Sequence, residues 1–296
     1  MTGTLVRIAF QGEMGAFSEE ALHQLWTDNA EPMPHRDFGD LIRAVQTGAA
    51  DRGIIPIENT ILGGIAAAHD AITAAPDVFV TGETVVNVHH CLLGPPGASF
   101  ASAKMVLAHP VALAQCGRFF AAHPRLDVHP VYDTGGAALD VANVGDPDIA
   151  AVASRGAAHR FKLRVLVPDI EDRNDNQTRF LVIARAPETL AAGTPSRTAL
   201  ITSHEDRPGA LLRVLEPLAR YGMDIHRLES RPTGDPWSYL FFLEFDHAFG
   251  EPVVDIVLDE MAAAARALRV LGTFPRWNPG RRGSIGWQAG VAGTDE

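Results

Sequence analysis

The sequence predicts an α/β protein in which a two-lobed domain precedes a smaller βαββαβ sandwich, and three observations predict this class. Short apolar, β-branched runs alternate with helical patterns along 1–186. A stretch at 187–196, rich in proline, glycine and small residues, then indicates a linker. Over 197–277 the order changes to strand, helix, strand, strand, helix, strand, which is typical of a ferredoxin-like sandwich.

Composition and charge narrow the possible functions. The chain has 296 residues, 46% of them hydrophobic, which is enough for more than one core. A net charge of -11 without a Lys/Arg-rich run argues against nonspecific nucleic-acid binding. No apolar run is long enough to span a bilayer, and no export signal is evident. The cysteines, Cys91 and Cys116, lack a metal-binding spacing and need not pair, which suits a reducing cytoplasm. Together these observations predict a cytoplasmic protein that binds neither membranes nor nucleic acid.

The first lobe is predicted from residues 5–87 and from a returning segment at 178–186. Its elements, in order, are a strand at 5–11, a helix at 18–26, a strand at 31–34, a helix at 38–47, a strand at 52–57, and an alanine-rich helix that ends near 74. Ser18 is the expected cap of the first helix, since a serine hydroxyl accepts from free N–H groups there.

The second lobe is predicted at 88–177, and a β-rich run at 78–93 is the expected crossing into it. Strands are expected at 106–108, 127–132, 150–153 and 165–167, with helices at 110–120, 135–144 and 156–161 between them. Two lobes joined by two crossings form a cleft, and ligands bind in such clefts.

Polar residues follow two strands of the first lobe, which is where α/β folds place chemistry. One junction has Glu58, Asn59 and Thr60, and the other has Thr178 and Arg179 directly before the apolar run at 180–184. Each junction alone is compatible with ordinary capping or with a solvated arginine. Two such junctions in one lobe favour a binding cleft.

Five stretches, in this order along the chain, resemble prephenate dehydratase. They are Gly-Glu-Met-Gly-Ala-Phe-Ser at 12–18, Pro-Ile-Glu-Asn-Thr at 56–60, His-Pro-Val-Ala-Leu-Ala-Gln-Cys at 109–116, Asp-Thr-Gly-Gly-Ala-Ala at 133–138 and Asn-Gln-Thr-Arg-Phe at 176–180. The likeness covers residues 5–185. It departs from the family's usual pattern at Thr60, where the family has serine, and at 133–135, where it often has Ser-Thr-Ala.

Residues 197–277 resemble the regulatory ACT domain of these enzymes, although Asp224 replaces a frequent asparagine. The stretches that match its two phenylalanine-site motifs are Gly209, Ala210, Leu211 and Leu212, and Glu229, Ser230, Arg231 and Pro232.

The resemblance implies a two-lobed catalytic domain with a type II periplasmic-binding-protein-like fold at 1–186, a linker at 187–196, an ACT domain at 197–277 and a flexible tail at 278–296. The chorismate mutase helices of some relatives are not expected. The implied reaction is the decarboxylation and dehydration of prephenate to phenylpyruvate in L-phenylalanine biosynthesis. Because aromatisation drives this reaction, we expect no cofactor and no metal.

The resemblance also implies roles for the junction residues. Thr178 would be the catalytic donor to the departing hydroxyl. Arg179 and the helix N-termini after Thr60 and Thr134 are candidates for binding the two carboxylates. The remaining expectations are that Asn59 and Thr60 orient the substrate, that Phe180 packs the cleft wall, and that Glu58 is a proton relay or a structural carboxylate. His109 is expected to be a proton donor or a ligand contact, or else a helix cap or a surface residue. Asp133 would add a negative charge beside a dianion, which argues against a direct role.

The implied effector is L-phenylalanine, bound at an ACT dimer interface of a homodimer or homotetramer. One alternative is an arogenate dehydratase, since a single amino group separates the two substrates. Another is a non-catalytic amino-acid-sensing or solute-binding module, which would give no reason for Thr178 beside Arg179.

Overall fold

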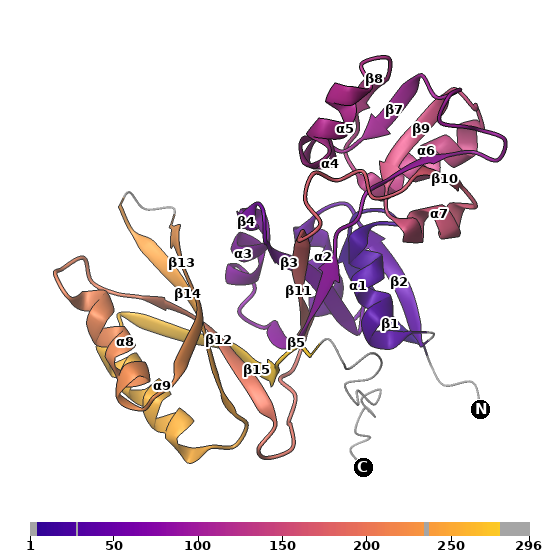
Figure 1. Cartoon of the computed structure of the whole chain (residues 1–296). Coiled ribbons are helices and arrows are strands. Elements are labelled where there is room, and N and C mark those ends of the chain that lie inside the picture. Colours follow the sequence, from indigo (N-terminus) through magenta and orange to yellow (C-terminus); the bar gives the residue numbers. More distant parts are fainter. Residues whose placement is uncertain (1–4, 28, 234–236, 279–296) are drawn as a thin grey trace, which may run out of the picture. The chain divides into compact units, whose positions relative to one another are not determined.

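Residues 5–27, 29–233 and 237–278 are described by a computed structural model of the chain (Figure 1). Of the predicted flexible tail at 278–296, only Asn278 lies within these residues. One unit of the described chain contains 5–71 and 84–180, and a second contains 72–83 and 181–278. None of the helices in the described ranges is long and apolar enough to cross a membrane.

The first sheet has the strand order β2-β1-β3-β11-β5, and the short β4 pairs with β3. Its strands are β1 Val6–Gln11, β2 Ala30–His35, β3 Arg52–Asn59, β4 Gly63–Gly64, β5 Phe79–Asn87 and β11 Gln177–Ala184, and its helices are α1 Phe17–Trp26, α2 Phe38–Thr47 and α3 Ala66–Thr73. The strand β1 runs parallel to both neighbours, and its Ile8 and Phe10 are completely buried. Such burial on both faces explains the nearly continuous apolar runs in the sequence.

The second sheet has the order β10-β6-β9-β7-β8. Its strands are β6 Cys91–Gly94, β7 Met105–Ala108, β8 Asp127–Pro130, β9 Ile149–Ala153 and β10 Arg164–Val167, and its helices are α4 Pro110–Gln115, α5 Gly117–Ala122, α6 Thr134–Val144 and α7 Arg155–Phe161. Two apolar clusters cover its faces, one with α6 and α7 and the other with α4 and α5. The helix predicted at 110–120 is two short helices that meet at Cys116.

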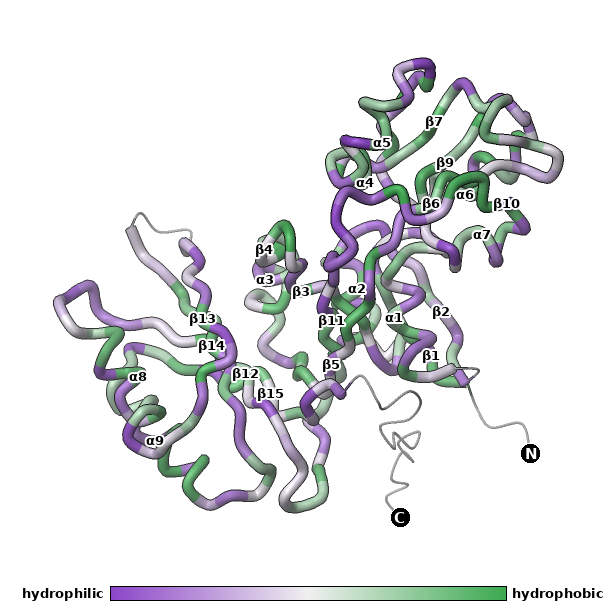
Figure 2. The backbone as a smooth tube through the Cα atoms, in the orientation of Figure 1, coloured by the Kyte–Doolittle hydropathy of each residue, from purple (hydrophilic) through white to green (hydrophobic). Residues whose placement is uncertain are grey.

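Two crossings connect the sheets, residues 88–90 after β5 and residues 168–176 before β11. They run side by side, because Val88 N–H donates to Asn176 O at 2.8 Å and Ile170 N–H donates to His90 O at 2.8 Å. Figure 2 shows the change from a hydrophilic return segment to the hydrophobic β11. The predicted α/β class, with a lobe around each sheet, is confirmed.

The third sheet is antiparallel in the order β13-β14-β12-β15, with helices α8 and α9. Its elements are β12 Pro195–Ser203, α8 Ala210–Arg220, β13 Asp224–Pro232, β14 Tyr239–Ala248, α9 Pro252–Ala264 and β15 Ala267–Pro275. Both helices pack on one face around a core that includes Val214, Phe245 and Val257 (Figure 1). This is the predicted βαββαβ order. The last helix ends at Ala264, and Leu268 already pairs with Thr202 in the sheet.

A buried ionic cluster joins β12 to the middle of β5. The Arg197 side chain is 6% exposed, and its guanidinium lies 2.8 Å from Asp246 and 3.2 Å from Glu83, whose side chains are 12% and 3% exposed. Glu83 also accepts from Trp277 N–H at 2.8 Å. Buried charges of this kind are stable only while each keeps its partner.

We therefore predict that Arg197→Met destabilises the chain by about 3–5 kcal/mol, because it removes the buried cation that lies beside both Glu83 and Asp246. Urea denaturation followed by circular dichroism measures this loss. The control is Arg207→Met, which breaks the exposed pair of Arg207 with Glu205 and should cost at most about 1 kcal/mol. Equal losses in the two variants would contradict the assignment.

Candidate active site

A cavity of about 360 Å³ lies between the two lobes, and both contribute to its walls. The first lobe supplies Asn59, Thr178 and Phe180, while the second supplies His109 and Thr134. These five of the residues predicted for the site are therefore brought together from four separate stretches of the chain. Glu58, Thr60 and Arg179 do not line the cavity.

Thr178 is held by the amide of Asn59, which connects the end of β3 to the start of β11. Asn59 Nδ2 donates to Thr178 Oγ1 at 2.9 Å and to Asn176 Oδ1 at 2.8 Å. Asn59 Oδ1 accepts from Ile61 N–H at 2.9 Å and from Leu62 N–H at 3.0 Å, which fixes the amide orientation. Since Thr178 Oγ1 accepts from Asn59, the hydroxyl hydrogen of Thr178 is available for another acceptor.

Thr60 binds the return crossing instead of facing the cavity. Its hydroxyl donates to Asp175 O at 3.0 Å and accepts from Gln177 N–H at 2.9 Å, and its own N–H donates to Gln177 O at 2.9 Å. No helix begins directly after Thr60, since β4 intervenes and α3 begins only at Ala66. Thr60 thus aligns β11 with β3.

Arg179 points away from the wall that carries Thr178, because successive side chains of a strand alternate between its two faces. Thr178 and Phe180 line the cavity, whereas the side chain of Arg179 is 7% exposed and lies 3.3 Å from Glu58 Oε1. The two residues that were predicted to bind a carboxylate and to relay a proton therefore pair with one another. In this arrangement Arg179 lies behind the cavity wall, paired with Glu58.

The second lobe meets residues 12–16 of the first at the N-terminus of α6. Asp133 caps this helix by accepting from Gly136 N–H at 2.9 Å, and it also accepts from Glu13 N–H at 3.4 Å. Burial raises the pKa of Asp133 above its ordinary value. Gly12 has a φ of +110°, and a Cβ there would lie 3.0 Å from the Asp133 carboxylate. A glycine at position 12 is what permits this approach.

Tyr132 adds a second contact between the lobes, since its hydroxyl donates to Glu13 Oε1 at 2.8 Å. Burial and this carboxylate raise the pKa of Tyr132 to about 12, so it stays a neutral donor. The sequence interpretation did not select Tyr132 or Glu13.

His109 caps α4 and also belongs to the cavity wall. Its Nδ1 accepts from Val111 N–H at 3.2 Å at the start of α4, and the residue also lines the cavity. Burial lowers the pKa of His109, which favours the neutral ring.

Sequence reasoning missed three further residues of the cavity wall: Ser18, His90 and Gln115. Ser18 was expected to cap α1, but the N-cap is Ala16, no side chain caps the helix, and Ser18 lies inside it. Ser18 and Gln115 belong to stretches that resemble the family, so those stretches could have identified them. His90 lies in the first crossing and has no such signal.

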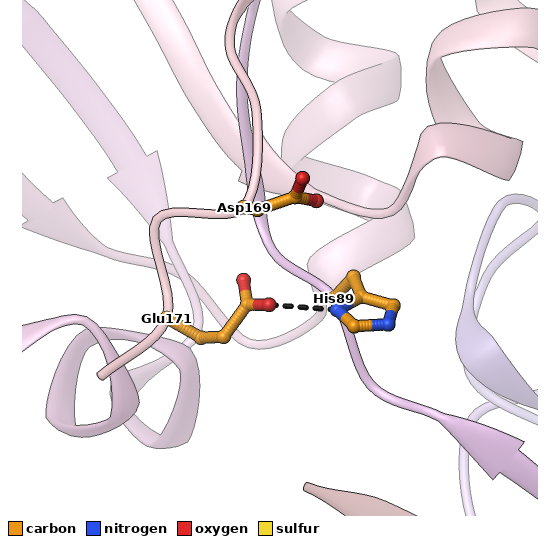
Figure 3. Close-up of side chains that lie close together, drawn as sticks. All are labelled: His89, Asp169 and Glu171. Carbon is orange, nitrogen blue, oxygen red and sulfur yellow. Dashed lines mark hydrogen bonds and ion pairs between the residues drawn. The ribbon is translucent and has the colours of Figure 1, made fainter. Parts of the chain in front are cut away.

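His89, Asp169 and Glu171 form a cluster at the crossings, with potential ligand atoms within 4.8 Å of one another (Figure 3). Glu171 lies 2.7 Å from His89 Nδ1 and accepts from His90 N–H at 2.9 Å. Asp169 is engaged through both oxygens by Arg155, at 2.9 Å each. Because all three side chains have partners, we assign the cluster to the ion pairs that hold the crossings together.

Comparison with known proteins agrees with a lyase built on this two-lobed fold. The family model described as prephenate dehydratase matches residues 8–188, and that described as the ACT domain matches residues 198–266. The chain belongs to the prephenate dehydratase family and carries a C-terminal ACT domain.

Curated relatives include plant and bacterial enzymes. Arogenate dehydratase/prephenate dehydratase 2 of Arabidopsis thaliana is 34% identical over 92% of this chain and 74% of its own length. The bifunctional chorismate mutase/prephenate dehydratase of Enterobacter agglomerans is 30% identical over 93% of this chain and 73% of its own length.

Solved structures with the same fold carry different descriptions. Prephenate dehydratase from Arthrobacter aurescens in complex with L-Phe has a TM-score of 0.82 and 30% identity, over 92% of this chain and 90% of that one. A protein described as GqqA, a novel type of quorum quenching acylase, has a TM-score of 0.83 and 34% identity, over 92% of this chain and 98% of that one.

The geometry predicts that Asn59→Asp lowers turnover by about 10²-fold with a smaller change in KM. Aspartate keeps the acceptor for Ile61 and Leu62 N–H but removes the donor to Thr178. The Thr178 hydroxyl then turns its own hydrogen toward the carboxylate. Steady-state kinetics measure the change. Because the variant also loses the donors to Asn176 Oδ1 and Gln177 O, its melting temperature is measured too, and the kinetics are taken well below it. Turnover close to wild type would contradict the role assigned to this amide.

Proposed function

We propose that the chain is a prephenate dehydratase, which converts prephenate to phenylpyruvate in L-phenylalanine biosynthesis. The observation that carries this proposal is the Thr178 hydroxyl, which lies on the wall of the interlobe cavity with its hydrogen available. Membership of the family supports the same reaction class. Asn59, in this proposal, orients Thr178 instead of contacting the substrate through its own amide.

The reaction needs few chemical groups from the protein. The bond from the ring to the carboxylate breaks and releases CO₂, its electron pair moves through the ring, and the C4–O bond breaks as the ring becomes aromatic. The departing hydroxide takes up a proton and leaves as water. Thr178 donates a hydrogen bond to the departing oxygen, and a positioned donor of this kind contributes about 10²–10⁴ in rate.

The substrate is a dianion, yet no lysine or arginine belongs to the described wall of the cavity. We propose that neutral donors hold its carboxylates, chiefly the Ser18 hydroxyl, the unblocked N–H groups at the start of α1, and Thr134 at the start of α6. Helix N-termini suit this task because their N–H groups are unpaired and carry partial positive charge. Arg179 contributes its positive charge from behind Thr178, while Phe180 and His109 shape the wall.

Two variants of Thr178 test its part in the reaction. Thr178→Val keeps the shape of the side chain but removes its hydroxyl, so turnover should fall by about 10²-fold or more. Thr178→Ser keeps the hydroxyl and should stay within about tenfold of wild type. Equal turnover in Val and Ser variants would remove the hydroxyl from the mechanism.

Arogenate is the second candidate substrate, because several curated relatives are described as arogenate dehydratases. The purified full chain should be offered each acid separately, with the aromatic product followed by absorbance. Preferential turnover of prephenate supports the proposal, and preferential turnover of arogenate replaces it. Tight binding without turnover of either acid would favour the non-catalytic sensing module.

We further propose that L-phenylalanine binds the ACT domain and regulates turnover, as the phenylalanine complex of a relative suggests. Gly209 begins α8 with a φ of +75°, and no side chain caps this helix, so its first N–H groups can receive a carboxylate. Ala210, Leu211 and Leu212 form the first turn of α8, and Glu229, Ser230, Arg231 and Pro232 end β13. In a homodimer or homotetramer, the motif of one copy would lie against that of another.

We also propose a cytoplasmic location. Cys91 and Cys116 are buried and form no disulfide, which suits a reducing compartment.

The regulatory proposal predicts that Ser230→Trp in the full chain leaves basal turnover unchanged but weakens the response to phenylalanine by about tenfold or more. A bulky ring at this exposed strand end would fill the effector site. Asp255→Trp, on the exposed side of α9, is the control and should respond normally. A normal response from the Ser230 variant would place the effector elsewhere.

A further inference from the structure

His90 and Gln115 form a buried pair in the cavity wall. His90 comes from the first crossing and Gln115 from the last turn of α4, and they are 2% and 8% exposed. The His90 Nε2 and Gln115 Oε1 atoms lie 2.9 Å apart. Both residues line the cavity, and neither has a role in the mechanism above.

The hydrogen-bond pattern fixes the form of the His90 ring. Gln115 Oε1 can only accept, so His90 Nε2 must carry the hydrogen and donate it. His90 Nδ1 is then a lone pair, in a position without solvent contact and without a partner in the described structure. The opposite tautomer would bury an N–H without an acceptor, which is rarer in proteins than a buried acceptor without a donor. Burial also lowers the pKa of His90, which favours this neutral ring.

The same bond decides which end of the Gln115 amide faces the cavity. Oε1 is occupied by His90, so the NH₂ group is the end left for a ligand. Within the described ranges no group accepts a hydrogen bond from this nitrogen, although Gln115 lies on the wall. The backbone is held too, since Gln115 O accepts from Asp172 N–H at 2.7 Å. The amide is therefore a fixed donor and not a freely rotating group.

A fixed neutral donor matters in a cavity whose described walls hold no lysine or arginine but include Asp133. We propose that His90 is a positioning residue, which locks the Gln115 amide so that its NH₂ donates to a carboxylate or keto oxygen of the substrate. The proposal rests on the proposed function and names the group that recognises the acid's oxygens. Preorganised donors gain affinity because the ligand does not have to order them.

The test measures the binding of phenylpyruvate, an acid with both carboxylate and keto oxygens, by calorimetry on the full chain. His90→Met removes the donor and should weaken binding by about tenfold or more. His90→Gln places an amide nitrogen near the former Nε2 and should restore most of the affinity. Gln115→Glu keeps the acceptor for His90 but replaces the cavity-facing nitrogen with oxygen, and it should weaken binding at least as much as His90→Met.

Two further comparisons separate positioning from simple stability. The double variant His90→Met with Gln115→Glu should bind no more weakly than Gln115→Glu alone, because both changes remove one interaction. The control is His123→Met, which alters another histidine of the second lobe. His123 does not line the cavity, and its Nδ1 lies 2.7 Å from Phe119 O, so this variant should leave binding unchanged. Binding by His90→Met within about twofold of wild type, or failure of His90→Gln to restore it, would overturn the proposal.

The binding test of the His90 role and the turnover test of the proposed function can fail independently. If the wild type turns over neither prephenate nor arogenate but binds phenylpyruvate in a His90-dependent way, the proposed function fails and the positioning role stands. If the wild type turns over prephenate with the same KM and kcat as His90→Met, the function stands and the positioning role fails.

Discussion

The site depends on one amide, that of Asn59, which ties the end of β3 to the start of β11. It donates to Thr178 and Asn176 while its oxygen holds two backbone N–H groups of the following loop. The amide is fully used in this way and cannot rotate without losing several bonds. The direction of the Thr178 hydroxyl follows from it, because an oxygen that already accepts from an amide keeps its hydrogen for another partner. A weakly acidic alcohol becomes a useful donor when its orientation is set in advance.

Electrostatics in the cavity rest on oriented neutral groups. In the proposed function a chain with net charge -11 binds an anionic acid, yet its buried Arg179 is turned toward Glu58 by the alternation of side chains along β11. The proposal therefore assigns the substrate's oxygens to N–H groups of helix starts, to hydroxyls and to the Gln115 amide. Such donors are short-ranged and directional, so they select geometry more strongly than a mobile lysine would. The hydrogen bonds of Glu13 with Tyr132 and Asp133 connect the two lobes beside the cavity.

The ACT domain is attached to β5 by a buried ion pair as well as by the chain that precedes β12. Residues 72–83, which include the start of β5, belong to the same unit as the C-terminal sandwich, and Arg197 bonds Glu83 there. The other end of β5 leads directly into the crossing that carries His90. Removing the sandwich would uncover buried charge on β5, so the proposed regulation is best tested in the full chain.

The sequence by itself determined the α/β class, the two sheets with their crossings and the βαββαβ sandwich, because strand and helix periodicities are local and glycine and proline mark the breaks. It also gave the stretches that meet in the cavity, including Asn59, Thr178 and His109. Only the tertiary structure decided which atoms face that cavity. The sequence placed Arg179 beside Thr178, but pleating separates them onto opposite faces. Ser18 resembled a cap, yet the chain enters α1 at Ala16. His90 has no motif around it, and the role proposed for it depends on Gln115, a partner 25 residues away that only folding brings within hydrogen-bond distance.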